Sequence, residues 1–136
     1  MRRNIIGIFA LAVLIAAVVP AMAHHSFSAE FDNTKQVEMK GYVTKIEWTN
    51  PHVWFYINVV DPATGKATRW GFEMGPPHGL QGRGWTRETM KIGDEVIVNG
   101  SRAKDGSNRA NARSVVLAKT GERFGTASSE NQADQQ

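Results

Sequence analysis

Apolar and polar residues alternate along much of this chain, which predicts strands with one buried face. The clearest case is residues 52–60. One face carries Val53, Phe55, Ile57 and Val59, and the other carries His52, Trp54, Tyr56 and Asn58. A similar pattern predicts strands over residues 66–74, 94–102 and 110–118. These segments are short and closely spaced, so the expected class is all-β.

One further strand is expected over residues 37–49, with an irregularity in its middle. Val37 and Met39 share one parity of the alternation, whereas Ile46 and Trp48 share the other. A shift of one residue moves the apolar side chains to the opposite face unless an extra residue is inserted. The pattern therefore predicts a β-bulge between the two halves of this strand.

A short helix is expected between the third and fourth strands. Thr86 is a suitable N-cap for a helix over residues 87–91, and Trp85 and Met90 have the spacing of a hydrophobic staple. The preceding residues 75–84 are rich in Gly and Pro and are expected to form a loop, either a lid or a long crossover.

The predicted order of three strands, a helix and two strands favours an OB-like five-stranded β-barrel. A β-sandwich is the alternative, but it usually needs about seven strands. Residues 24–35 are expected to form an arm or edge strand, and the barrel domain is expected over residues 24–118. Residues 119–136 are polar and are expected to be disordered, because they bury too little apolar area.

The first 23 residues have the pattern of a secretory signal peptide. Arg2 and Arg3 precede an apolar run over residues 5–19, and Ala21-Met22-Ala23 comes next as a cleavage site. Cleavage after Ala23 would leave His24 as the first residue of a periplasmic protein with no membrane span. An uncleaved anchor is the alternative, although the apolar run is short for a spanning helix.

Composition narrows the chemistry. The chain carries a formal charge of +3, and loss of Arg2 and Arg3 leaves 3 − 2 = +1 on the mature protein. Because the remaining charges are interspersed, no nucleic-acid partner is expected. The chain has no cysteine, so disulfides and thiolate chemistry are excluded. No nucleophile elbow and no catalytic set occur, so an enzyme is not expected.

His24 and His25 form a candidate copper site. A histidine at the mature N-terminus offers its amino group and its imidazole to one metal, and nitrogen ligands of this kind suit Cu(II). A third nitrogen would come from His52 or His78. The alternative is that the two histidines simply come after a cleavage site and bind no metal.

A candidate ligand-binding face lies on the polar side of residues 52–60. In an OB barrel the loops after the first and fourth strands flank the binding face. Here the first of these loops leads into His52, and the second carries Asn108 and Arg109. Trp54 and Tyr56 lie on the same face and could stack on a flat or sugar-like ligand.

The same aromatic face could instead be covered. Phe27 and Phe31 of the arm could pack on Trp54 and Tyr56, and the face would then be closed. Both interpretations remain open from the sequence. The function that we expect is an accessory module that binds a small ligand or a periplasmic partner protein, with a copper-binding protein as the alternative.

Several motifs together resemble a family of small secreted bacterial proteins that is known only as a domain of unknown function. They are Ala23-His24-His25-Ser26-Phe27, Trp48-Thr49-Asn50-Pro51-His52-Val53-Trp54, Gly84-Trp85, Gly93-Asp94-Glu95-Val96 and Arg102-Ala103-Lys104-Asp105-Gly106-Ser107-Asn108-Arg109. The resemblance covers the chain from His24 to about Leu117. It implies export and a single β domain, and it implies no activity. A more distant resemblance, in strand order only, is to periplasmic OB-fold proteins.

Overall fold

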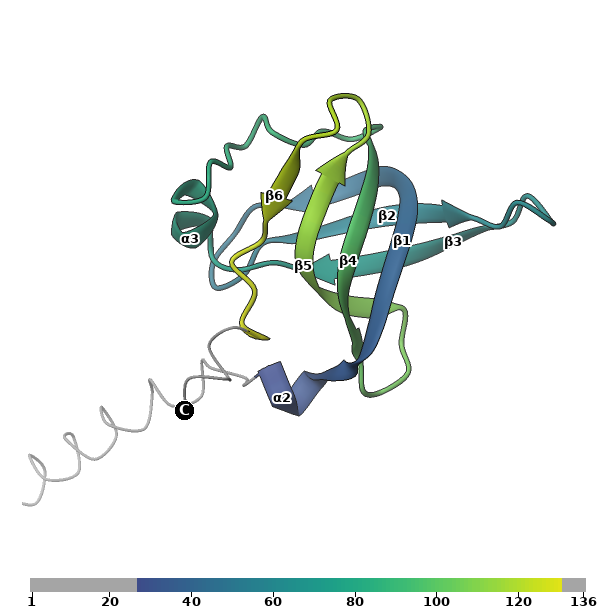
Figure 1. Ribbon diagram of the computed structural model, residues 1–136, viewed down its shortest axis with the longest axis horizontal. Coiled ribbons are helices and arrows are strands. Elements are labelled where there is room, and N and C mark those ends of the chain that lie inside the picture. The colour runs from purple at the N-terminus through teal and green to yellow at the C-terminus, as the bar shows by residue number, and fades with distance from the viewer. Residues whose placement is uncertain (1–26, 131–136) are drawn as a thin grey trace, which may run out of the picture.

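Six strands form one sheet that closes into a barrel (Figure 1). The structure is a computed structural model, and it describes residues 27–130. The predicted signal peptide, His24 and His25 therefore lie outside the described residues. The elements are α2 (Phe27–Glu30), β1 (Phe31–Glu47), β2 (Trp54–Val60), β3 (Ala67–Glu73), α3 (Pro77–Gln81), β4 (Glu95–Ala103), β5 (Arg109–Leu117) and β6 (Arg123–Gly125). No helix within this range is long and apolar enough to cross a membrane.

The strand order confirms the predicted all-β, OB-like barrel. The sheet runs β3-β2-β1-β4-β5-β6, and a parallel pairing between β3 and β5 closes the ring. At this closure Gly71 lies opposite Arg109, and Glu73 lies opposite Asn111. The sixth strand, β6, pairs only with β5 and was not expected from the sequence.

The predicted bulge in the first strand is confirmed. The register of β1 against β2 shifts between Val43 and Lys45, where an extra residue restores the apolar face to the core. β1 begins earlier than residue 37, at Phe31, because its first half pairs with β4 while its second half pairs with β2. One long, bent strand thereby supplies two sides of the barrel (Figure 1).

The barrel interior contains an apolar core. Seven of its residues are at most 8% exposed, namely Val53, Phe55, Ile57, Trp70, Phe72, Val96 and Val98. Phe55 and Phe72 lie on neighbouring strands with their rings stacked, 5.4 Å between centroids. Leu80 of α3 and the loop residues Trp85 and Met90 add to the same core.

The helix prediction over residues 87–91 is wrong. The helix between β3 and β4 is instead α3, inside the segment that was expected to be a loop (Figure 1). α3 begins with Pro77, whose fixed φ and missing N–H suit the first helical position. Thr86 does accept a hydrogen bond from the N–H of Glu88, but Thr89 bonds back to Thr86 and closes a turn. The backbone there forms a turn, in which the N–H of Thr89 donates to the carbonyl of Thr86 three residues earlier.

The prediction of a disordered tail is also wrong for residues 119–130. β6 pairs with β5, and Phe124 packs against Trp85 with 5.1 Å between ring centroids. Beyond β6, Thr126, Ser128 and Glu130 are buried polar residues. The polar composition failed as a guide because hydrogen bonds to the barrel, rather than apolar area alone, hold this segment.

Candidate functional site

Trp54 and Tyr56 form an aromatic platform on the outer face of β2. Their ring centroids are 6.5 Å apart, and the rings are inclined by only 24°. Gly71 of β3 lies directly opposite Tyr56. A Cβ atom at Gly71 would lie 3.0 Å from Cε1 of the Tyr56 ring, so the missing side chain lets that ring lie close against the sheet.

Cations surround Tyr56. The guanidinium of Arg69 lies 4.7 Å from the ring centroid, and Nζ of Lys45 lies 5.4 Å from it. Both are within the range of a cation–π interaction. Lys45 also pairs with Glu47 at 2.5 Å, whereas Arg69 makes no ion pair among residues 27–130. Arg69 therefore offers an exposed charge without an acidic neighbour bound to it.

Glu47 fixes the hydroxyl of Tyr56. The phenol O–H donates a hydrogen bond of 3.0 Å to a carboxylate oxygen of Glu47. Hydrogen bonds from Lys45 and Tyr56 lower the pKa of Glu47, and partial burial together with this bond raises the pKa of Tyr56. The pair therefore consists of a carboxylate and a neutral phenol at neutral pH. The ring is held in one orientation.

The structure brings Asn108 and Arg109 to the same face. The carbonyl of Asn108 accepts a hydrogen bond of 3.0 Å from the N–H of Gly71, and Arg109 lies opposite Gly71. Tyr56, Gly71 and Arg109 thus form one row across β2, β3 and β5. Arg109 is bound by Asp105, 3.1 Å away, whose pKa is about 2, chiefly because the Ser107 hydroxyl donates to it.

The arm covers one end of this platform. Phe27, Phe31 and Ala103 form a small apolar cluster, and Trp54 packs against it. The expectation of a covered face therefore holds for Trp54. Tyr56 is not part of the cluster, and it faces Arg69 and Lys45 instead.

His52 forms a pair that the sequence did not reveal. Its Nδ1 lies 2.7 Å from a carboxylate oxygen of Glu73, and the Glu73 side chain is only 6% exposed. Glu73 lies opposite Trp54 in the β2–β3 ladder, so the pair sits at the arm end of the platform. A carboxylate bound to Nδ1 fixes the orientation of the imidazole and leaves Nε2 as its second nitrogen.

The His52–Glu73 pair predicts a pH-dependent stability. The hydrogen bond that His52 donates to Glu73 raises the pKa of His52 above 6.5, and the charges of Glu73 and Glu30 add to this while burial opposes it. The folded state therefore favours the imidazolium, and its stabilisation is complete below about pH 6.5 and is lost as the pH rises through the raised pKa. The free energy of unfolding, measured with urea from pH 5 to 9, should therefore fall as the pH rises.

The matched variant for this prediction is His52→Gln, which keeps a polar side chain but cannot titrate. Its free energy of unfolding should be nearly flat over the same pH range. An equal decline in the wild type and His52→Gln would assign the pH dependence to other groups.

Residues 27–130 contain no group of three or more histidine, aspartate or glutamate side chains that could hold a metal ion. Within this range, His52 contributes one nitrogen next to Glu73, and His78 is exposed in α3. The remaining predicted ligands, His24 and His25, lie outside the described residues.

Comparison with known proteins places the chain in a family without assigning an activity. No curated protein and no solved structure matches it. Residues 12–112, most of the chain, match the model of a family described as "Family of unknown function (DUF6152)". As the resemblance implied, the chain belongs to this family of unknown function.

Proposed function

We propose that this protein is an exported, periplasmic binding module that holds a small ligand or a partner on the outer face of β2 and β3. The observation that carries the proposal is the row of Tyr56, Gly71 and Arg109 with Arg69 above the ring. An aromatic ring can stack on a flat or sugar-like ligand, and a guanidinium beside it can pair with an anionic group of that ligand.

The charges of this face favour an anionic ligand. Lys45, Arg69 and Arg109 are all exposed, and two carboxylates, Glu47 and Asp105, lie among them. Because both carboxylates already bind a cation of the face, Arg69 remains available for a ligand carboxylate. A sugar acid combines the two features, since its ring can stack and its carboxylate can pair with arginine.

Replacement of Tyr56 or Arg69 is expected to weaken binding of such a ligand. The probe is a trisaccharide of galacturonic acid, titrated calorimetrically into the mature protein. Loss of the ring in Tyr56→Ala, or of the charge in Arg69→Gln, should each weaken binding at least about tenfold, the equivalent of about 1.4 kcal/mol.

The control variant is Arg123→Gln, which removes an exposed arginine from β6, a strand that does not contribute to this row. It should bind the trisaccharide as the wild type does. A neutral glucose trisaccharide should bind more weakly than the acid. If Arg123→Gln and Arg69→Gln lower the affinity equally, the platform is not the binding face.

Copper binding is a second candidate, and the position of the arm favours it. Phe27 packs next to Trp54, and Trp54 is two residues from His52 in the sequence. The charge of Glu30 in α2 helps to raise the pKa of His52. His24 precedes Phe27 by three residues, which span at most about 10 Å when extended. A terminal amine and imidazole at His24 could therefore approach Nε2 of His52.

The copper prediction requires protein with its natural terminus. Material purified from the periplasm, with an intact mass that confirms His24 as the first residue, should bind one Cu(II) ion in a calorimetric titration. A Gly-Ser-Gly extension before His24 should weaken binding sharply, because it separates the imidazole from the free amine. His52→Gln should weaken it as well. Equally weak binding by native and extended protein would rule out this site.

A further inference from the structure

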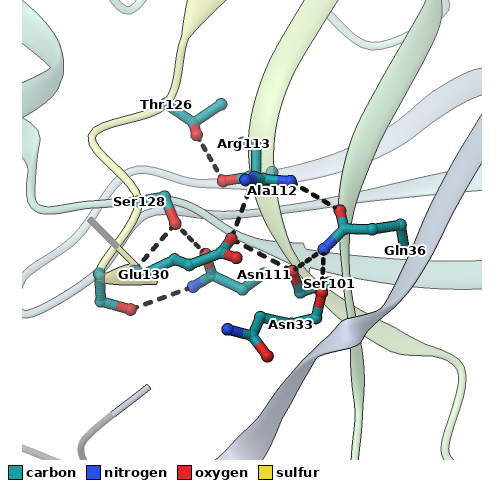
Figure 2. A network of polar contacts seen from close by, with 10 residues as sticks. Asn33, Gln36, Ser101, Asn111, Ala112, Arg113, Thr126, Ser128 and Glu130 are labelled. Atoms are coloured by element: carbon teal, nitrogen blue, oxygen red, sulfur yellow. Dashed lines mark hydrogen bonds and ion pairs between the residues drawn. The ribbon is translucent and has the colours of Figure 1, made fainter. Parts of the chain in front are cut away.

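A segment of five residues after β6 lies over the outer face of the barrel and is held by polar contacts. We call this segment, residues 126–130, the strap. It covers side chains of β4 and β5 that would otherwise face solvent (Figure 2). Ser101 and Asn111 beneath it are fully buried, and Thr126, Ser128 and Glu130 of the strap are at most 4% exposed.

The strap is first attached through its backbone. The carbonyl of Thr126 accepts a hydrogen bond of 2.8 Å from the N–H of Gly75, and the Thr126 hydroxyl donates to the carbonyl of Ala112. A Cβ atom at Gly75 would collide with the backbone of Ala127. The close approach of the strap therefore depends on a glycine in the segment after β3.

The side-chain amide of Asn111 contacts both serines of the strap. Its oxygen accepts a hydrogen bond from the Ser128 hydroxyl, and its nitrogen donates one of 3.3 Å to the Ser129 hydroxyl (Figure 2). The amide of Asn111 therefore needs a donor at position 128 and an acceptor at position 129, and a serine hydroxyl supplies each.

The carboxylate of Glu130 is bound at the end of the strap. Ser101 donates a hydrogen bond of 3.2 Å to it, and Nε of Arg113 lies 3.1 Å from the same oxygen. Gln36 bridges these two donors, since its amide nitrogen bonds Ser101 at 3.0 Å and its oxygen accepts from Arg113 at 3.0 Å (Figure 2). The donors are thus arranged around a carboxylate.

We propose that the polar surface formed by Gln36, Ser101, Asn111 and Arg113 is a peptide-binding site, and that the strap is its intramolecular occupant. The ligand that it fits is an acidic peptide with the pattern Thr-x-Ser-Ser-Glu, supplied by a partner chain in place of the strap, that bends as the strap does at Ala127, whose φ is 49°, and at Ser129. This site lies on β1, β4 and β5, and Asn111 is two residues from Arg109 of the β2–β3 face.

The polar character of the contacts makes exchange feasible. When the strap leaves, water can bond to Ser101, Asn111 and Arg113, so each lost hydrogen bond costs little net free energy. Release of an apolar segment would expose apolar surface without such compensation. The strap also belongs to the last part of the described chain, so its release leaves the closed barrel pairings intact.

Tethering favours the strap over any free peptide. A covalently linked segment acts at an effective concentration in the millimolar range, so a free peptide competes poorly with an intact strap. A weakened strap removes this advantage while the surface beneath it stays unchanged. Full-length protein with Ser128→Ala and Glu130→Gln is therefore the receptor in which binding from solution should be visible.

In the test, an acetylated and amidated peptide of residues 125–130 is titrated into this isotope-labelled double variant, and the signals of the labelled protein are recorded by NMR. The Asn111 side-chain amide and the Arg113 Nε–H signals should shift and saturate. The wild-type receptor should need at least tenfold more peptide for the same shift. Glu130→Gln alone serves as a second receptor if the double variant unfolds, and should show an intermediate response.

The matched control is the same peptide carrying Ser128→Ala and Glu130→Gln, which should leave both signals unchanged. Equal shifts from the native and the altered peptide, or no saturable shift in either receptor at millimolar native peptide, would overturn the proposal. A peptide that binds at the β2–β3 face instead, with shifts at Gly71 and Arg69, would also overturn it.

Discussion

Replacement of Phe55 by alanine should lower the free energy of unfolding by about 3–5 kcal/mol, the usual cost of removing a buried aromatic side chain. Phe55 is 0% exposed and stacks on Phe72, its partner in the β2–β3 ladder. Its loss therefore removes apolar contacts and leaves a cavity that strands fixed on both sides cannot fill. Urea denaturation followed by tryptophan fluorescence measures the effect.

The control for this prediction is Phe55→Leu, which keeps most of the apolar volume and should cost clearly less. Val60→Ala, at an exposed position on the same strand, should cost much less than either. A loss below about 1 kcal/mol for Phe55→Ala would contradict the position of this residue in the core.

Trp85→Ala is expected to be comparably destabilising, at about 3–5 kcal/mol. The Trp85 side chain is 2% exposed and lies in the core, and its indole N–H donates a hydrogen bond of 2.8 Å to the carbonyl of Gly125 in β6. Its ring also packs on Phe124. Loss of this residue should therefore release β6 as well as open a cavity, and hydrogen exchange at Phe124 should accelerate.

Trp85→Phe separates the two roles. It keeps an aromatic ring in the core but removes the donor, so the lost hydrogen bond should add about 1 kcal/mol to a modest packing cost. Unchanged exchange at Phe124 in Trp85→Ala would show that β6 is held independently of this side chain.

The sequence predicted the barrel because alternation directly reports which face of a strand is buried. Val53, Phe55 and Ile57 alternate with residues that lie outside, and the structure places them accordingly. The shift of parity in the first strand likewise indicated the bulge between Val43 and Lys45. Both patterns involve residues that are close in the sequence. Both arise because the apolar side chains of each strand must face the core.

The segments that the sequence misplaced depend on contacts between distant residues. α3 packs Leu80 into the core, which a loop rich in Gly and Pro does not indicate. The strap is ordered by Asn111 and Ser101, which lie 17–29 residues away from their partners Ser128 and Glu130. The composition of the tail alone does not indicate these hydrogen-bond partners in β4 and β5.

The candidate site was predictable in part. Alternation placed Trp54 and Tyr56 on one outer face, but it did not identify Arg69 and Gly71 as their neighbours. That assignment requires the register of the β2–β3 hairpin, and a slip of one residue would place Trp70 opposite Tyr56 instead of Gly71. The hairpin loop, in which the N–H of Asp61 bonds to the carbonyl of Lys66, sets this register.

The most direct test of the proposed binding face is an NMR map of where the galacturonic acid trisaccharide acts on the wild-type protein. We predict saturable shifts at the Gly71 amide, the Arg69 Nε–H and the Arg109 Nε–H, with the Asn111 side-chain amide under the strap unchanged. Shifts that cluster at Gln36, Ser101, Asn111 and Arg113, or signals of the β2–β3 face that do not respond while the trisaccharide binds elsewhere, would contradict the account.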